Sequence, residues 1–558
     1  MRYGLMMFLI LFGFFAEAQE NYSTITEKAS EIMEVAKDDA GYGKALELYE
    51  KAFRAFPQNI DSDGLYNASI LASKLKNNDK AFQYLMSLSS AKGSGYSFPG
   101  WNYILEEDAE KEYRNLLSDP RWNVLKKEAV QYKAQFYNEL KEKEKEFYQV
   151  HKNRLKEIKD PEMLYREIRN LNPYQPKKDR DYSIVFKIND SVNTSFFIHF
   201  PASYNPQKKY TLMFFLHGAV RNNELADYQL ADWNLGGWNR YYTKYADRND
   251  VIMVFPRASK KYNWMLSDDG FFMIPEMLKQ VKKTINIDDN KVFIAGHSNG
   301  ATGSFSYLMK QPTQFAGFYG LNTYPKVFTG GTFVENIKNR SFINFSTDKD
   351  YYYPPNANDD FSKMMKGIQA DYQEYRYNGF PHWFPQFDES EPAYQIIFKD
   401  LNARKRNPFP KEISWEFDDE RYGNIDWISN IKLDTINRKI AGKKELNFKI
   451  NKWLAYDDHD SLKEQNVDKY AFDFPRKSGK IKAEYNNNVF RVETSDIKSF
   501  SINISPEVVN LNEKVKVYVN GKLYFNRKIN YNHEYLLENF LNTQDREQVW
   551  INYIDVKI

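Results

Sequence analysis

The sequence predicts a multidomain protein: an α-helical repeat, then a mostly parallel sheet with helices on both faces, then an antiparallel β-sandwich. Three observations predict this order. Residues 19–160 have helical periodicity, residues 161–405 alternate short apolar runs with helix-like segments, and residues 406–558 alternate polar and apolar side chains. At roughly 100–200 residues per domain, a chain of 558 residues is long enough for these parts.

The composition excludes several kinds of chemistry. The chain has no cysteine, so disulfides, thiolate metal sites, a cysteine nucleophile and a cysteine-linked lipid anchor are ruled out. Its 78 Lys and Arg residues nearly balance 75 Asp and Glu residues, so we expect no binding of nucleic acid. Nucleotide-binding and metal-binding motifs are absent, and we therefore expect no cofactor and no metal.

The first 18 residues have the pattern of a signal peptide. Arg2 precedes an apolar run from Leu5 to Phe15, and Ala16-Glu17-Ala18 supplies the small residues that signal peptidase reads. The apolar run is about a dozen residues, shorter than the ~20 needed to span a bilayer. We therefore expect cleavage after Ala18 and an exported protein, periplasmic or secreted, that is soluble and carries neither a membrane span nor a lipid anchor.

Residues 19–160 are expected to be helical. Ala45, Tyr49, Ala52 and Pro57 place two small residues and an aromatic residue on one helical face, followed by a stop. Ala81 repeats the position of Ala45 after 36 residues, and this spacing resembles that of tetratricopeptide repeats. Such repeats stack into concave surfaces, so a protein partner could bind here; a plain helical spacer is the alternative.

Residues 161–405 contain short apolar runs separated by helix-like segments, of which 271–285 and 304–310 are the clearest. Buried strands joined by helices predict a mostly parallel sheet that is covered on both faces. The strand-like runs are Tyr182–Ile188, Thr194–Phe200, Tyr210–Leu216, Val251–Phe255, Val292–Ala295, Phe315–Gly320 and Phe342–Phe345.

Pro408 and Pro410 mark the start of the last region, residues 406–558. Polar and apolar residues alternate there, and Asn520-Gly521 between two alternating runs is a strong hairpin signal. The region carries no catalytic constellation. Both a stabilising appendage and a module that binds substrate or partner remain open.

The strongest chemical signal is Gly296-His297-Ser298-Asn299-Gly300, which follows an apolar run and precedes a helix-like segment. This strand–turn–helix context is typical of a nucleophilic serine. The glycines two residues before and after the serine let the strand and the helix approach each other. An ordinary turn with a surface serine is the alternative.

A nucleophilic serine needs a base, and enzymes with this turn carry serine, acid and histidine in that order. His382, His459 and His533 follow Ser298 in the chain. The last two fall in the predicted β-sandwich, whereas His382 lies in a loop after a strand-like segment. His382 is therefore the expected base, and a histidine packed among neighbouring aromatic residues is the alternative.

The acid is expected in the loop that follows the strand-like run ending at Phe345. Asp348 and Asp350 both lie there, and we favour Asp350, four residues before Pro354, with Asp348 as the alternative. The acid would orient the histidine and stabilise its protonated form during attack.

Two backbone N–H groups are expected to stabilise the oxyanion. One is that of Asn299, directly after the nucleophile. The other comes from His217-Gly218-Ala219 at the end of an early strand, with Ala219 favoured and Gly218 as the alternative. His217 is expected to order this loop rather than to titrate.

The segments LHGAV, FPRASKKYNWMLSDD, GHSNGA, STDKDYYYP and GFPHWF together resemble a secreted bacterial α/β-hydrolase. The resemblance is to the polyhydroxybutyrate depolymerase and feruloyl esterase group, over about residues 180–405. It implies a triad of Ser298, Asp350 and His382, with Trp264 lining the substrate cleft; a tryptophan packed in the interior is the alternative for Trp264. We also expect His297 to contribute to substrate binding.

The expected function is a serine hydrolase that cleaves carboxylic esters through an acyl-enzyme intermediate. The ester could be carried on a polysaccharide or a polyester chain. A serine peptidase similar to prolyl oligopeptidase uses the same parts and is one alternative. A non-catalytic binding or scaffold protein of the cell envelope is the other, because more than half of the chain lies outside the hydrolase region.

Overall fold

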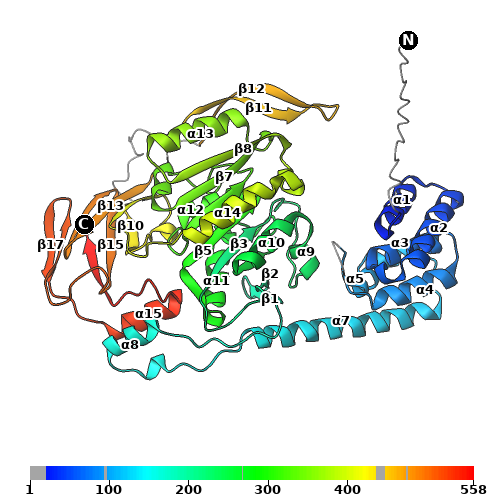
Figure 1. Ribbon diagram of the computed structural model, residues 1–558, viewed down its shortest axis with the longest axis horizontal. Helices are drawn as coiled ribbons and strands as arrows, with labels where there is room; N and C mark the ends of the chain where they lie inside the picture. The colour runs from blue at the N-terminus through cyan, green and yellow to red at the C-terminus, as the bar shows by residue number, and fades with distance from the viewer. Residues whose placement is uncertain (1–19, 94–96, 267, 435–445, 473–475) are drawn as a thin grey trace, which may run out of the picture. The chain divides into compact units, whose positions relative to one another are not determined.

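The computed structural model describes residues 20–93, 97–266, 268–434, 446–472 and 476–558 (Figure 1). The predicted signal peptide, residues 1–18, lies outside this part. The chain forms two compact units, which divide between Glu139 and Leu140 within helix α7 (Pro120–Phe147). In the described ranges, no helix has the length and apolar character needed to cross a membrane.

The first unit is helical, and short polar residues start its helices. Asn21, Asp38, Asp61 and Asn77 each accept a hydrogen bond from a backbone N–H of the first turn. Consecutive helices pack on one another, and the apolar face predicted around Ala45 is buried. The tetratricopeptide-like assignment remains a prediction. Before α7 the helices are α1 (Tyr22–Val35), α2 (Asp39–Ala55), α3 (Ser62–Lys74), α4 (Asn78–Ser89), α5 (Gly100–Leu105) and α6 (Ala109–Glu112).

The second unit is built around an eight-stranded sheet of order β1-β2-β4-β3-β5-β6-β7-β8. Strand β2 runs antiparallel to both β1 and β4, and every other neighbouring pair is parallel, which confirms the mostly parallel prediction. The strands are β1 (Asp181–Lys187), β2 (Asn193–His199), β3 (Tyr210–Leu216), β4 (Val251–Pro256), β5 (Ile287–His297), β6 (Gly317–Leu321), β7 (Ser341–Lys349) and β8 (Tyr372–Pro381).

Helices cover both faces of this sheet (Figure 1). On β3, Leu212 and Phe214 face one core with α11, α12 and α13, whereas Met213 and Phe215 face a second core with α10 and α14. Strands β3 and β4 are buried along their whole length, and burial on both faces explains why, apart from Thr211, they carry only apolar and aromatic side chains. The helices are α9 (Ala231–Leu235), α10 (Arg240–Asn249), α11 (Met273–Thr284), α12 (Asn299–Lys310), α13 (Pro355–Gly367) and α14 (Glu391–Ala403).

The C-terminal region contains two further sheets, of order β17-β16-β14-β13-β9 and β10-β15-β18, that share one hydrophobic core. Helices α8 (Pro161–Arg169) and α15 (His533–Thr543) contribute to this core. The strands are β9 (Glu412–Phe417), β10 (Ile428–Leu433), β13 (Gly479–Asn486), β14 (Val489–Ser495), β15 (Ile497–Ile504), β16 (Val515–Val519), β17 (Lys522–Arg527) and β18 (Asn552–Lys557).

The sequence predicts the Asn520-Gly521 hairpin of this region correctly, but not the direction in which two of its strands pair. The hairpin expected at Asn520-Gly521 joins β16 to β17, and both turn residues have positive φ. Strands β14 and β16, however, pair in parallel, which departs from the antiparallel prediction. The reason is that β15, between them in the chain, belongs to the other sheet, so the chain must cross over and return.

Strands β11 (Lys449–Tyr456) and β12 (Leu462–Tyr470) form a separate hairpin. It lies between sandwich strands in the chain, and the sequence predicts it as part of the β-sandwich. It packs instead on the hydrophobic core of the eight-stranded sheet, through residues that include Ile450 and Phe472. The eight-stranded sheet therefore receives a contribution from a segment beyond residue 405.

Buried charges join the eight-stranded sheet to the C-terminal region. Lys282 Nζ lies 3.1 Å from Asp289 and 3.2 Å from Asp545. Asp545 also pairs with Arg406 at 2.9 Å, and Asp289 pairs with Arg546 at 3.1 Å. All five side chains are almost fully buried, so each charge depends on its partners for compensation.

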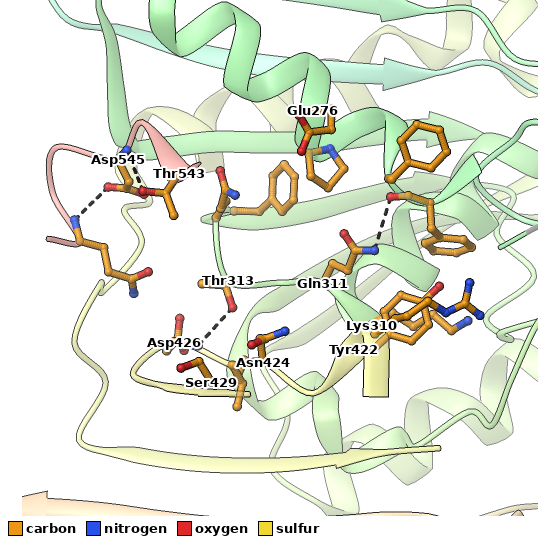
Figure 2. Close-up of a pocket in the computed structure, with 18 of the residues that line it drawn as sticks. Glu276, Lys310, Gln311, Thr313, Tyr422, Asn424, Asp426, Ser429, Thr543 and Asp545 are labelled. Atoms are coloured by element: carbon orange, nitrogen blue, oxygen red, sulfur yellow. Dashed lines mark hydrogen bonds between the residues drawn. The ribbon is translucent and has the colours of Figure 1, made fainter. Parts of the chain in front are cut away.

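A cavity of about 830 Å³ lies beside this junction and is shown in Figure 2. Its lining includes Lys310 and Gln311 from the end of α12, and Tyr422 and Asp426 from the C-terminal region. Gln311 donates to the backbone oxygen of Phe271 across the cavity wall. Ser298, His382 and Asp350, the catalytic residues predicted from the sequence, are not among the residues that line this cavity.

Candidate active site

Ser298 occupies a strained turn between β5 and α12. Its φ is +57° and its ψ is −122°, a combination that non-glycine residues rarely adopt. The flanking glycines are required by close approach: a Cβ on Gly296 would lie 2.3 Å from the carbonyl group of Gly300, and one on Gly300 would lie 1.8 Å from the oxygen of Leu216. The turn therefore holds the Ser298 side chain at the carboxyl edge of the sheet.

His382 lies just beyond the end of β8, at the same edge, and contacts two of the predicted site residues. Its Nε2 is 2.8 Å from Ser298 Oγ, and its Nδ1 is 2.8 Å from Asp350 Oδ1. An ionised carboxylate only accepts hydrogen bonds, so Nδ1 carries the proton and Nε2 is free to accept the serine hydroxyl. Ser298, His382 and Asp350 thus form one hydrogen-bonded series.

Asp350 follows β7 directly and is only 1% exposed. Its Oδ1 also accepts the backbone N–H of Tyr352 at 2.8 Å, and its Oδ2 accepts Asn322 Nδ2 at 3.0 Å. These bonds fix the carboxylate toward the histidine. The alternative acid, Asp348, lies within β7 and accepts the backbone N–H of Gly379 at 2.7 Å, a contact that ties together the ends of β7 and β8.

The loop after β3 brings backbone N–H groups close to the serine. A Cβ on Gly218 would lie 3.1 Å from Ser298 Cβ, and Ala219 has a φ of +52°. Val220 donates its N–H to Asn299 Oδ1 at 3.2 Å, so that group is already engaged. The N–H of Asn299 itself is in the first turn of α12, where it has no partner within the helix.

His217 orders this loop. Its Nδ1 donates to the oxygen of Gly218 at 2.7 Å, and its Nε2 accepts the N–H of Ala258 at 3.2 Å. Because a trans peptide points its C=O and N–H in opposite directions, the bond to the Gly218 oxygen turns the N–H of Ala219 away from His217. Desolvation of the ring lowers the pKa of His217 to about 4, so it stays neutral at ordinary pH.

Trp264 supports the same loop from inside the protein. Its ring packs against His217, with 4.8 Å between centroids, and fills the space beside Gly303, where a Cβ would lie 2.3 Å from Trp264 Cδ1. The side chain is 1% exposed. Trp264 therefore presents no open face on which a substrate could stack.

His297 is also enclosed. Its Nε2 donates to the backbone oxygen of His382 at 2.9 Å, and its ring packs against those of Trp238 and His382. Burial, reinforced by the charge that His382 can carry, lowers the pKa of His297 to about 3. Its contacts make it a support for His382 rather than an exposed surface for a substrate.

Two residues of the site are not expected from the sequence. Asn322, which holds Asp350, follows β6 and has a φ of +54°. Tyr352 accepts Asn299 Nδ2 at its hydroxyl group, at 2.9 Å. Asn322 could have been predicted as a site residue because it is a polar residue directly after a buried strand. The carboxyl ends of parallel strands lie at one edge of the sheet, where the site is.

The strand order, the serine on the strand–helix turn and the loop beside it together make up an α/β-hydrolase arrangement. Comparison with known proteins found no matching family model and no matching curated protein.

Among solved structures, a thermostable esterase is 22% identical, with a TM-score of 0.34 over 41% of this chain. The match spans 64% of that esterase, less than two thirds of its length. The fluorophosphonate-binding serine hydrolase F of Staphylococcus aureus is 15% identical over 39% of this chain and 98% of its own, with a TM-score of 0.31. A ferulic acid esterase is 16% identical over 40% of this chain and 98% of its own, also with a TM-score of 0.31.

Proposed function

We propose that this protein is a serine hydrolase that cleaves carboxylic esters through an acyl-enzyme intermediate. The observation that carries the proposal is the hydrogen-bonded series from Ser298 Oγ through both ring nitrogens of His382 to Asp350, with 2.8 Å at each step. A weakly nucleophilic hydroxyl needs such a base, and the base needs an oriented partner.

In the first half of the reaction, Ser298 Oγ attacks the ester carbonyl carbon while His382 Nε2 takes the hydroxyl proton. Asp350 stabilises the resulting imidazolium. The carbonyl oxygen becomes an oxyanion, which the N–H groups of Asn299 and of Ala219 or Gly218 would stabilise. The bond between the acyl carbon and the alcohol oxygen then breaks, and the alcohol oxygen leaves with the proton from Nε2.

In the second half, water attacks the acyl group on Ser298. His382 takes a proton from that water and returns it to Ser298 Oγ as the acyl–oxygen bond breaks. The carboxylic acid is released, and the starting state of all three side chains is restored.

Labelling with a fluorophosphonate probe tests this proposal. We expect the wild-type protein to be labelled and to hydrolyse p-nitrophenyl acetate, and Ser298→Ala to lose both properties. Ser304→Ala is the matched control, because Ser304 lies in the same helix and donates to the backbone oxygen of Ile294, away from the series. An active but unlabelled wild type, or equal labelling of Ser298→Ala, would contradict the proposal.

The same groups can cleave amides, so the preference for esters is a separate part of the proposal. We expect acetyl and aryl esters to be turned over much faster than peptidyl amides with the same leaving group. Comparable rates on both would favour a peptidase. Complete inactivity on both classes, with intact folding, would favour a binding or scaffold role.

A further inference from the structure

The β11–β12 hairpin is attached to the core that carries the proposed active site. Ile450 is fully buried, and Phe472 lies at the base of the hairpin with its ring 6.5 Å from that of Phe361 in α13. Phe448 and Val467 are partly buried against the same core. Strand β11 runs along α13, apart from the two C-terminal sheets (Figure 1).

Trp453 fixes the hairpin to the loop that contains the proposed acid. Its Nε1 donates to the backbone oxygen of Tyr351 at 3.0 Å. Its ring packs against those of Tyr324 and Tyr353, and Lys469 Nζ lies 4.3 Å from its centroid. A tryptophan with its N–H bonded and its ring packed is held in one orientation, so the hairpin has a defined position relative to this loop.

A row of three aromatic side chains leads from His382 to the hairpin; we name it the aromatic rim. Trp383 and Tyr351 lie beside His382, with ring centroids 5.5 Å and 5.3 Å away, and 5.8 Å from each other. Tyr456, at the end of β11, lies 5.4 Å from Tyr351. Trp383 and Tyr456 are 39% and 44% exposed, although large aromatic side chains are normally more buried.

The position of the rim beside His382 indicates which part of a substrate it would meet. His382 Nε2 gives its proton to the leaving alcohol oxygen, so the alcohol part of the ester must lie on the histidine side of Ser298. Exposed aromatic faces stack against rings that have an apolar face, and both aromatic rings and sugar rings have one.

We propose that the aromatic rim binds a ring in the alcohol part of the ester, and that the β11–β12 hairpin thereby makes the C-terminal region a determinant of specificity. This inference rests on the proposed ester hydrolysis. Tyr456 is its distinctive element, because it is the rim residue that the hairpin itself contributes.

The test compares acetates that share one acyl group and differ in the alcohol: benzyl acetate, a monoacetylated methyl xyloside and butyl acetate. We expect Tyr456→Ala to lower kcat/KM about 3- to 10-fold for one or both ring-bearing acetates, mainly through KM, and to leave butyl acetate within about twofold. Tyr456→Phe keeps the ring and should behave as the wild type does. A loss confined to benzyl acetate identifies an aromatic ring, and a loss confined to the xyloside identifies a sugar.

Tyr470→Ala is the matched control, because Tyr470 lies on the same hairpin, is 60% exposed and pairs with Lys449 at the opposite end from Tyr456. We expect it to change none of the three rates. Unchanged selectivity in Tyr456→Ala, or an equal loss on all three acetates, would overturn the proposal.

Fluorophosphonate labelling separates this result from the proposed function. Failure of wild-type labelling would remove the hydrolase proposal itself. Normal labelling of Tyr456→Ala together with unchanged selectivity would contradict only the proposed role of the aromatic rim.

Discussion

The Nε2 of His297 donates a hydrogen bond of 2.9 Å to the backbone oxygen of His382. The residue that precedes Ser298 in the chain therefore holds the histidine that contacts Ser298. This link joins the last residue of β5 to the loop after β8 without using either side-chain nitrogen of His382.

Removal of this donor should slow the reaction more than it weakens binding. We expect His297→Phe to lower kcat about tenfold with little change in KM, because the loop of His382 loses one buried hydrogen bond. His297→Gln can still donate from its side-chain amide and should recover most of the rate. Steady-state kinetics on p-nitrophenyl acetate measure both; equal losses in the two variants would contradict a positioning role.

The choice between the two acids can be tested by paired substitutions. Asp350→Asn should lower kcat about 10³- to 10⁴-fold, because an amide no longer favours the histidine tautomer that accepts the serine proton. Asp348→Asn should lower kcat less than about tenfold, since Asp348 accepts a hydrogen bond from Gly379 rather than from His382 in the structure. A greater loss in Asp348→Asn would reverse the assignment.

The depressed pKa of His297 predicts a loss of stability in acid. The unfolded chain binds a proton to this residue below about pH 6.5, whereas the folded protein does so only near pH 3. Stability from this group is therefore complete above pH 6.5 and falls as the pH decreases, by at most about 1.4 kcal/mol per pH unit. Urea unfolding between pH 7 and 4.5 measures this slope.

His297→Phe is the comparison for that slope, because it cannot titrate. Its unfolding free energy should depend less on pH over the same range than that of the wild type. His217, whose pKa is also lowered, to about 4, remains in both proteins and contributes equally to each. Parallel curves for the two proteins would show that His297 is not responsible.

The buried charges at the junction with the C-terminal region should be sensitive to the loss of one member. Burial alone would raise the pKa of Asp545, but the charges of Arg406 and Lys282 outweigh it and lower the pKa, so the carboxylate is ionised. Asp545→Asn would leave two buried cations without this partner, which typically costs about 3–5 kcal/mol. Denaturant unfolding measures the change. The exposed Asp458→Asn is the control and should have little effect, and an equally small effect of Asp545→Asn would contradict the prediction.

Much of the eight-stranded sheet could be predicted because strands such as β3, β4 and β6 are buried on both faces and therefore stand out as apolar runs. The predicted strand Tyr210–Leu216 has the observed bounds of β3. Ser298 could be predicted as the candidate nucleophile because the turn requires glycine at fixed positions around it. His382 could be identified because few histidines follow Ser298 in the chain.

The remaining features depend on tertiary contacts that leave no local pattern. The β11–β12 hairpin is polar along much of its length, and only packing of residues such as Ile450 decides which core it joins. In the sequence, Arg546 and Asp289 look like ordinary surface charges, because nothing local indicates that two charges so far apart in the chain form an ion pair. The enclosed position of Trp264 also follows from contacts with Gly303 and His217, which its sequence neighbours do not specify.

The pairing of Asp289 with Arg546 has a consequence for when, during translation, the hydrolase core can be completed. Asp289 lies on β5, the strand that leads to Ser298, but Arg546, one of its two cationic partners, is synthesised 257 residues later. Until the ribosome has passed Arg546, Asp289 therefore has only Lys282, at 3.1 Å, of its two buried cationic partners. Because domains tend to fold as they emerge, this dependence delays completion of the hydrolase core until the C-terminal region has been made.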